Sequence, residues 1–256
     1  MSAIHPTAII DSSAELGEVA IGPYAVIEAN AVVGTGTTIG AHSVVKRYTR
    51  IGRDNRIAEH VVIGGDPQDL KFTDCASFVE LGNGNIVREG VTIHRGSAPE
   101  SPTRIGDGCF LMATAHVAHD CTVGNRVVIA NGAMLGGVVS IGDAAFVSGN
   151  VVVHQFCRIG RLAMAAGGAR VIQDCLPFMI SEGAPARARV LNIVGLRRAG
   201  VPAEEIAALK RALHALRTAG SLAAALDRLA ADNSAAVAEL AEFIRSATRG
   251  FAHPRG

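Results

Sequence analysis

The sequence contains no tryptophan and only two tyrosines and eight phenylalanines among its 256 residues. With so few aromatic rings, a core must be filled by small and branched aliphatic side chains, which suits a narrow, repetitive architecture. The chain also has almost no net charge, because its 24 lysines and arginines are balanced by 23 aspartates and glutamates. The chain has no basic block and no interleaving of basic and aromatic residues, so nucleic acid is not an expected partner.

Cysteines and long hydrophobic runs are also sparse. The five cysteines are odd in number and form no Cys-x-x-Cys pair, which argues against a disulfide scaffold and a zinc knuckle. They favour a reducing compartment, so the expected location is cytoplasmic. The N-terminus lacks the basic and apolar regions of a signal peptide, and glycine or charge interrupts the apolar stretches elsewhere. We therefore expect no stable membrane insertion.

An aliphatic repeat of six residues dominates the first two thirds of the chain. Of the 25 positions reached by taking every sixth residue from Ile27 to Val171, 21 are Ile, Leu or Val. Neither an amphipathic helix nor an alternating strand has this period. Three short strands per coil do, each turning one aliphatic side chain inward, so the repeat predicts a parallel β-helix. Ile4, Ile10 and Leu16 run one residue out of phase, which places a single-residue slip between Leu16 and Ile27.

Glycine often follows the aliphatic position, as at Gly40, Gly52, Gly106 and Gly124. A chain that turns sharply after each short strand needs backbone freedom at the turn. We therefore expect these glycines to adopt φ values that other residues avoid.

The repeat fails at Asp69, Cys75 and Pro99, within segments 65–80 and 95–103, which we expect to leave the prism as loops. Residues 1–190 are accordingly assigned to the β-helix domain. In residues 191–256 the apolar spacing changes to three and four, which predicts a small helical C-terminal domain. Three amphipathic helices are expected beyond residue 202, with Ser221 and Ser234 as N-caps.

The most unusual polar cluster contains His116, His119 and Asp120, in the cleanest run of repeats. Neither histidine can enter an aliphatic core without a large desolvation cost, so both should project outward. They are either exposed corner residues or a site in which one is a general base. Such a base can assist direct transfer from an activated thioester, which requires no GxSxG elbow and no nucleophilic cysteine.

Other polar and glycine residues fall on the same predicted wall. Gly137 follows His119 by 18 residues, one coil, and its amide can face an oxyanion or merely serve the turn. His154 and Gln155 come nearly two coils after the histidine pair. His94 borders one loop and the run Gln68, Asp69 and Lys71 lies in the other, where polar and positive groups suit a phosphorylated substrate or are simply solvated.

Five blocks of sequence show a specific resemblance to a known family. They are 67–71 (PQDLK), 92–96 (TIHRG), 116–126 (HVAHDCTVGNR), 153–157 (VHQFC) and 192–198 (NIVGLRR). In order and spacing they resemble the UDP-N-acetylglucosamine O-acyltransferases of the hexapeptide-repeat superfamily, and the likeness covers nearly the whole chain. A generic hexapeptide protein shares the repeat without these blocks.

The resemblance implies a mainly β fold, a left-handed parallel β-helix followed by a small helical domain. It implies a homotrimer with sites between neighbouring prisms. The implied reaction moves a 3-hydroxyacyl group from acyl carrier protein to the 3-hydroxyl of UDP-N-acetylglucosamine, the first step of lipid A biosynthesis. No cofactor and no metal are implied.

The resemblance also implies roles for individual residues. His119 is the general base, Asp120 orients it, and the Gly137 amide stabilises the oxyanion. Gly167 occupies the position that limits acyl length, and a glycine there implies a longer chain. The positions matching sugar, acyl or nucleotide contacts are Gln68, Asp69, Lys71, His94, His116, His154, Gln155, Asn192 and Arg198.

Three positions depart from the family pattern. Val138 stands where the family usually has histidine, Val194 where it has glutamate, and Ala199 where it has a second arginine. Each change removes a polar contact, and a lost charge-assisted hydrogen bond costs about 1.5–3 kcal/mol of binding. One explanation is a different acceptor, such as a UDP-3-amino sugar that yields an amide; another is a divergent paralogue with weak activity.

Three other functions compete with this one. The sister enzyme that N-acylates UDP-3-O-acylglucosamine shares the prism and a histidine, but the 192–198 block and the absence of an extra domain before Ile4 disfavour it. A γ-type carbonic anhydrase would use the histidines as zinc ligands between subunits. A rigid binding module without catalysis would leave His119 dispensable.

Overall fold

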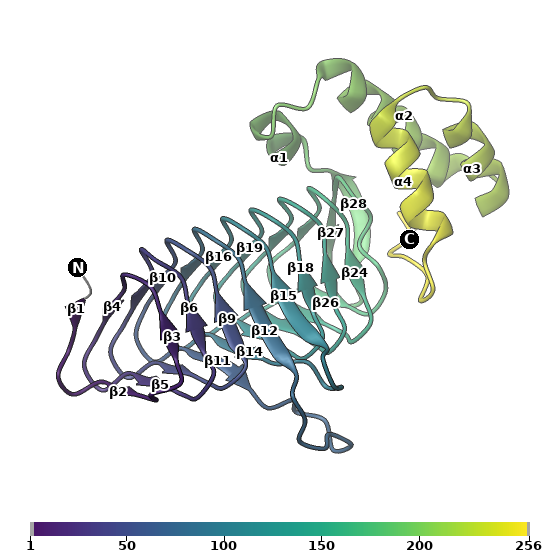
Figure 1. Ribbon diagram of the computed structural model, residues 1–256. Helices are drawn as coiled ribbons and strands as arrows, with labels where there is room; N and C mark the ends of the chain where they lie inside the picture. The colour runs from purple at the N-terminus through teal and green to yellow at the C-terminus, as the bar shows by residue number, and fades with distance from the viewer. Residues whose placement is uncertain (1–2, 255–256) are drawn as a thin grey trace.

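A computed structural model describes residues 3–254. Within this range the chain forms 28 short β-strands and four helices. The strands stack as three sheets that form the walls of a prism, parallel throughout except that β28 pairs antiparallel with β27, with β1 at one end and the helices at the other (Figure 1). The fold is mainly β, a left-handed parallel β-helix followed by a small helical region, which confirms the predicted fold class.

Each wall of the prism takes every third strand of the chain up to β26, and the last two strands, β27 and β28, both join sheet A. Sheet A contains β1 (Ala3–Ile4), β4 (Ala20–Ile21), β7 (Thr38–Ile39), β10 (Arg56–Ile57), β13 (Ile86–Val87), β16 (Phe110–Leu111), β19 (Val128–Ile129), β22 (Phe146–Val147), β25 (Met164–Ala165), β27 (Met179–Glu182) and β28 (Arg187–Leu191). Sheet B contains β2 (Ile9–Ile10), β5 (Val26–Ile27), β8 (Val44–Val45), β11 (Val62–Gly65), β14 (Thr92–His94), β17 (His116–Val117), β20 (Met134–Leu135), β23 (Val152–Val153) and β26 (Arg170–Val171). Sheet C contains β3 (Glu15–Leu16), β6 (Val32–Val33), β9 (Thr49–Ile51), β12 (Phe78–Leu81), β15 (Pro102–Ile105), β18 (Thr122–Val123), β21 (Ser140–Ile141) and β24 (Arg158–Ile159).

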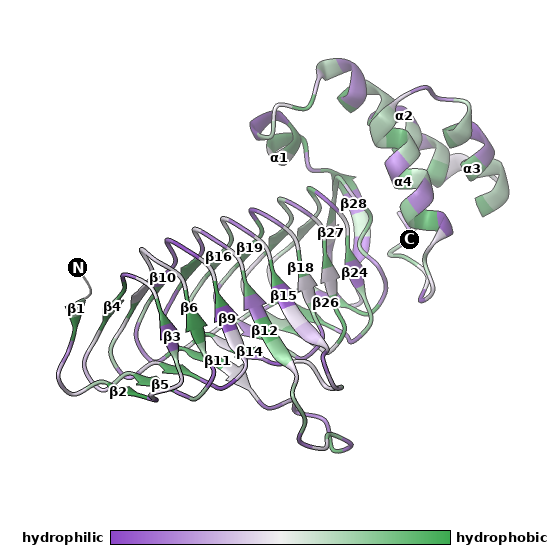
Figure 2. Cartoon of the chain, in the orientation of Figure 1, coloured by the Kyte–Doolittle hydropathy of each residue, from purple (hydrophilic) through white to green (hydrophobic). Residues whose placement is uncertain are grey.

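The interior of the prism is the aliphatic row that the repeat predicts. Ile27, Ile63, Val117 and Ile159 are at most 1 % exposed, and their counterparts in the other coils are buried with them. Figure 2 shows the hydrophobic colour returning on strands from coil to coil. Full burial of one such side chain contributes about 1.5–3 kcal/mol, so the stacked row supplies the main stabilisation of the prism.

Two insertions leave the prism at the edge where the chain passes from sheet B to sheet C, which we call the B–C edge. Paired positions in sheet C are 18 residues apart from Val33 to Ile51, but 30 apart from Ile51 to Leu81 and 24 apart from Leu81 to Ile105. The insertions are thus 12 and 6 residues long, whole multiples of the repeat, which explains why the six-residue phase survives them. The loops comprise residues 66–77 and 95–101, shorter than predicted because the segments 78–81 and 102–105 pair as strands.

The glycines after the aliphatic positions are needed for a different reason from the one predicted. None of Gly40, Gly52, Gly106 and Gly124 has a positive φ. A Cβ at Gly52 would lie 2.6 Å from the Gly82 carbonyl oxygen, and one at Gly106 would lie 2.8 Å from that of Gly124. Glycine is therefore required there by the close approach of successive coils. Positive φ occurs elsewhere in the corners, mostly at residues with side chains.

Four helices follow the prism: α1 (Ile193–Arg198), α2 (Ala203–Thr218), α3 (Leu222–Ala230) and α4 (Ala235–Arg245). Ser221 and Ser234 cap α3 and α4 as predicted, each accepting a backbone N–H in the first turn. Helix α1 escaped prediction because six residues give too short an apolar pattern. The helices share a second core with Leu176 and Phe178 at the end of the prism. Among residues 3–254, no helix combines the length and apolar character needed to cross a membrane.

Candidate active site

The B–C edge carries the polar pair that the sequence singled out. His119 Nδ1 lies 2.7 Å from Asp120 Oδ2, and the two side chains are 15 % and 19 % exposed. Neighbouring residues of a strand face apart, but Asp120 lies in a corner with φ of 58°, which turns its carboxylate beside the imidazole. If Nδ1 donates to this carboxylate, Nε2 is the unprotonated nitrogen and can accept a proton.

Asp120 is held by the second loop. It accepts hydrogen bonds from the Ser97 hydroxyl at 2.6 Å, the Ser97 backbone N–H at 3.1 Å and the Ser101 hydroxyl at 2.9 Å. Burial alone would raise the pKa of Asp120, but the bonds from Ser97, His119 and Ser101 lower it below its ordinary value. Asp120 is therefore a carboxylate at neutral pH, fixed on several sides and able to orient His119. Neither serine was identified from the sequence, since each lies about 20 residues away.

Gly137 lies directly over the His119 ring. A Cβ built on Gly137 would be 2.5 Å from His119 Nε2, so only glycine leaves room for the imidazole. The backbone confirms the one-coil stacking, because the Val138 N–H donates to the His119 carbonyl at 3.0 Å. The Gly137 N–H has no acceptor among the described residues. A free amide beside the basic nitrogen is the arrangement that an oxyanion site requires.

Two further histidines cluster on the outer face of sheet B beside this edge. His116 Nδ1 lies 2.7 Å from Thr92 Oγ1, and its ring meets that of His94 edge-on with centroids 4.9 Å apart. Burial lowers the pKa of His116. His94 is 8 % exposed, and among the described residues its Nδ1 has no hydrogen-bond partner. A buried polar atom without a partner is uncommon in a folded protein and is one mark of a functional position.

Burial, together with His116 and then His119, lowers the pKa of His94 from 6.5 to about 4. Between these values the unfolded chain binds a proton that the folded chain does not, so the free energy of unfolding should fall as pH drops from about 6.5 to about 4. The expected loss is on the order of 3 kcal/mol at the acid end. Urea unfolding at pH 7 and pH 5 should show a smaller difference for His94→Gln than for wild type. His214→Gln, on an exposed face of α2, controls for loss of an imidazole, and an unchanged pH dependence in His94→Gln would contradict the assignment.

The first loop and the coils above His119 bring other predicted residues to the same edge. Gln68, Asp69 and Lys71 are exposed on loop 66–77, where the Lys71 N–H donates to Asp69 Oδ1 at 2.9 Å. Gln155 lies one coil above Gly137 and is exposed, as is His154, whose Nδ1 lies 3.1 Å from the Gln155 carbonyl oxygen. Ten of the thirteen predicted residues therefore belong to the B–C edge, its loops or the adjoining face of sheet B.

The remaining three lie away from the B–C edge. Gly167 is exposed at the corner between β25 of sheet A and β26 of sheet B. Asn192 is the N-cap of α1 and Arg198 its last residue, and both line a groove of about 770 Å³ against sheet A, together with Arg126, Phe146 and Met164. Asn192 is buried and caps α1, accepting the Gly195 N–H at 3.0 Å, whereas Arg198 is exposed. One chain alone does not join these residues to His119.

The three residues that depart from the family pattern are exposed, one beside Gly137 and two at α1. Val138 is 41 % exposed next to Gly137, and Val194 is 59 % exposed on α1, near the exposed Ala199. Val138 has φ of 60°, a conformation that is strained for a β-branched side chain. The valine therefore offers the site an apolar surface while its backbone is under strain.

The cysteine nearest this edge is unsuited to nucleophilic catalysis. Cys121 adjoins Asp120 but is fully buried, donates to the Gly136 carbonyl at 3.2 Å, and has a pKa raised by burial to about 12. It is therefore not a thiolate nucleophile. In the part of the chain that the structure describes, no three His, Cys, Asp or Glu side chains are grouped to hold a metal ion.

The matches to known families follow the two parts of the chain. Residues 174–252 match the family model described as UDP N-acetylglucosamine O-acyltransferase, domain 2, and residues 102–137 match the bacterial transferase hexapeptide (six repeats). The acyl-[acyl-carrier-protein]–UDP-N-acetylglucosamine O-acyltransferase of Syntrophobacter fumaroxidans is 42 % identical over 96 % of this chain and 98 % of its own. The enzyme of that name from Paraburkholderia phymatum is 43 % identical over 98 % and 99 %.

The fold comparison agrees with the sequence comparison. The UDP-N-acetylglucosamine acyltransferase of Francisella novicida superposes with a TM-score of 0.94, covering 99 % of this chain and 94 % of its own at 34 % identity. Both the prism and the helical tail are thus shared with relatives matched over nearly their full length. The chain belongs to the UDP-N-acetylglucosamine O-acyltransferase family.

Proposed function

We propose that the protein transfers a 3-hydroxyacyl group from acyl carrier protein to the 3-hydroxyl of UDP-N-acetylglucosamine, the first step of lipid A biosynthesis. The observation that carries the proposal is the His119–Asp120 pair beneath the Gly137 amide, in a chain 42 % identical to a relative named for that reaction. A base and an oxyanion donor at one point are what direct attack on a thioester requires.

In the proposed step, His119 Nε2 accepts the proton of the sugar hydroxyl while Asp120 accepts the Nδ1–H. The hydroxyl oxygen bonds to the thioester carbonyl carbon, and the resulting oxyanion accepts the Gly137 N–H. Collapse breaks the carbon–sulfur bond, and the departing carrier-protein thiolate takes the proton from His119 and leaves as the thiol. The thioester is already activated, so we propose that the reaction uses neither a metal nor a cofactor.

We assign substrate binding to the polar groups around this point. The unpartnered His94 Nδ1 supports a contact with substrate, as do the positions of His116, His154 and Gln155. The exposed Gln68, Asp69 and Lys71 are proposed to bind the sugar nucleotide, with Asn192 and Arg198 toward the nucleotide end. At Gly167 a Cβ would meet only the Gly149 carbonyl oxygen, at 3.7 Å, which supports an open acyl groove and a longer chain.

We further propose a homotrimer with sites between neighbouring prisms. The proposal rests on the separation of the predicted residues, with His119 at the B–C edge, Gly167 at the A–B corner and Arg198 beside sheet A. A closed ring can bring different faces of identical chains together around one substrate. Because all five cysteines are free thiols, we also propose a cytoplasmic location.

A second acceptor, a UDP-sugar with a 3-amino group, is favoured by one observation: Val138 presents an apolar, exposed side chain beside Gly137 where the family pattern has histidine. Its product would be an amide. The mechanism and the donor would be unchanged.

The test is acyl transfer by the purified protein, offered 3-hydroxyacyl carrier proteins of several chain lengths with either acceptor. We expect an alkali-labile ester on UDP-N-acetylglucosamine and higher turnover with longer chains. If transfer gives an alkali-stable amide on the amino sugar and no ester on UDP-N-acetylglucosamine, the UDP-3-amino sugar is the acceptor. If neither acceptor receives an acyl group, the proposed function is refuted.

A further inference from the structure

Arg95 is the most deeply buried charge of the prism, with its side chain 0 % exposed. A buried guanidinium is tolerated only when its donors are paired. Arg95 Nε donates to Asp66 Oδ1 at 3.0 Å, and Nη2 to Asp74 Oδ1 at 2.6 Å. Nη1 donates to the Cys75 carbonyl oxygen and, at 3.1 Å, to Ser77 Oγ. Every polar partner of this side chain belongs to loop 66–77.

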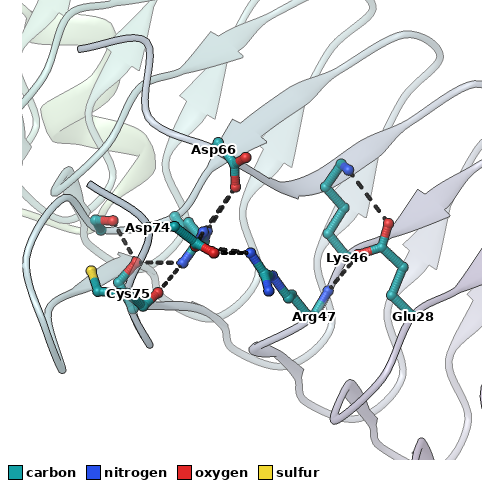
Figure 3. Close-up of polar contacts among 9 residues, drawn as sticks. Glu28, Lys46, Arg47, Asp66, Asp74 and Cys75 are labelled. Carbon is teal, nitrogen blue, oxygen red and sulfur yellow. Dashed lines mark hydrogen bonds and ion pairs between the residues drawn. The ribbon is translucent and has the colours of Figure 1, made fainter. Parts of the chain in front are cut away.

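The same loop has a second, outer tie to the prism. Arg47, on the preceding coil, bonds both oxygens of Asp74 at 2.8 and 2.7 Å, and its backbone N–H donates to Glu28 (Figure 3). The pKa of Asp74 is lowered first by its bond from Arg95 and then by that from Arg47. Arg47 and Asp74 are 42 % and 61 % exposed, so this outer pair alone fixes the loop weakly. The buried Arg95 is therefore the principal anchor.

The loop tip has no anchor of its own. Residues 68–71 are exposed, Leu70 fully so, and their two described hydrogen bonds join Asp69 to Lys71 and Phe72 within the loop. Phe72 in turn packs its ring under the Arg95 guanidinium, 5.1 Å from the centroid. The orientation of Asp69 and Lys71 thus depends on contacts made through Arg95.

Arg95 also adjoins the residues that hold Asp120. Its backbone N–H donates to the Gly65 carbonyl at 2.9 Å, and two residues later Ser97 binds the Asp120 carboxylate. The short loop 95–101 therefore joins the loop tip on one side to the His119–Asp120 pair on the other. A shared support of this kind fixes the distance between a binding loop and a base.

We propose that Arg95 is a positioning residue for acyl transfer: its guanidinium fixes loop 66–77 so that Asp69 and Lys71 meet the sugar nucleotide at a set distance from His119. The inference rests on the proposed function. It predicts an effect on the affinity for the UDP-sugar and a smaller one on the acyl donor, because the loop carries the groups assigned to the sugar nucleotide.

The experiment compares wild type with Arg95→Met, Arg95→Lys and Asp74→Asn. Arg95→Met should raise the KM for UDP-N-acetylglucosamine about tenfold or more, with little change in the KM for the acyl donor. Lysine keeps the charge but lacks the five-donor fork, so Arg95→Lys should behave almost like Arg95→Met. Asp74 is exposed, so Asp74→Asn should fold and give a smaller shift of the same kind.

A second readout does not depend on activity. Trypsin cleaves after Lys71, and the rate in the native protein reports opening of the loop. Cleavage should be about tenfold faster in Arg95→Met than in wild type. Arg88→Met, which removes an exposed arginine paired with Glu89 on another edge, is the matched control and should change neither readout.

The outcomes separate the two proposals. Unchanged cleavage in the Arg95 and Asp74 variants, or faster cleavage with an unchanged KM for the UDP-sugar, would overturn the positioning role. A wild-type protein inactive toward both acceptors would overturn the proposed function and the substrate part of this inference. In that case cleavage still decides whether Arg95 holds the loop.

Discussion

Replacing His119 by alanine should lower the kcat for acyl transfer about 10³-fold, with the KM values for both substrates changed far less. The Nε2 atom of His119 lies against Gly137 and its Nδ1 is paired with Asp120, and a general base contributes about 10²–10⁴-fold to rate. Steady-state kinetics with saturating acyl carrier protein and UDP-sugar measure the effect.

The control for this variant is His42→Ala, the same change at an exposed histidine of the A–B edge. It should retain wild-type kcat. If His119→Ala kept activity within a few fold of wild type, His119 would not be the base. The rigid binding module would then become the better description of the prism.

The same variant tests whether the site is shared between chains. His119→Ala and Arg198→Ala change different regions of one prism, so in a homotrimer with sites between neighbours, mixed subunits can pair an intact B–C edge with an intact α1. Random mixing of equal amounts should restore about a quarter of the wild-type sites. No recovery after denaturation and refolding of the mixture, under conditions that restore the wild type, would contradict a site shared between neighbouring chains.

The sequence predicts the parts of this fold that depend on period. The six-residue phase runs through both loops because their lengths are whole repeats, and the same arithmetic correctly places Gly137 one coil above His119. The helical N-caps follow from local chemistry that needs no tertiary information.

What escapes prediction depends on contacts across the chain. The bonds from Ser97 and Ser101 to Asp120, and from Arg95 to Asp74, join residues about 20 positions apart inside irregular loops, where no period indicates direction. For Gly167 the repeat does carry the position, since 48 residues, two coils and two further repeats, separate it from His119, but Arg198 lies beyond the repeats and its place beside sheet A follows only from the fold. The role of the glycines after the aliphatic positions was misjudged because coil spacing is a tertiary property.

Gly137→Ala should lower kcat about 10²-fold while leaving the fold intact. The added methyl carbon would fall 2.5 Å from His119 Nε2 and 2.6 Å from Cε1, so the imidazole must move. A displacement near 1 Å at a reacting group costs about 10²-fold in rate. Gly137 has no positive φ, so the alanine adds no backbone strain, and thermal unfolding should change little.

The matched control is Gly149→Ala, where the new methyl would meet only the Asn131 carbonyl oxygen, at an ordinary 3.5 Å. A double-mutant cycle then assigns the cause. Alanine at position 137 keeps the backbone N–H, so if the loss arises from displacement of the base, Gly137→Ala should have no further effect in a His119→Ala background. If the two losses multiply instead, the methyl acts on the oxyanion or on the substrate, and the crowding of His119 is not what makes glycine necessary here.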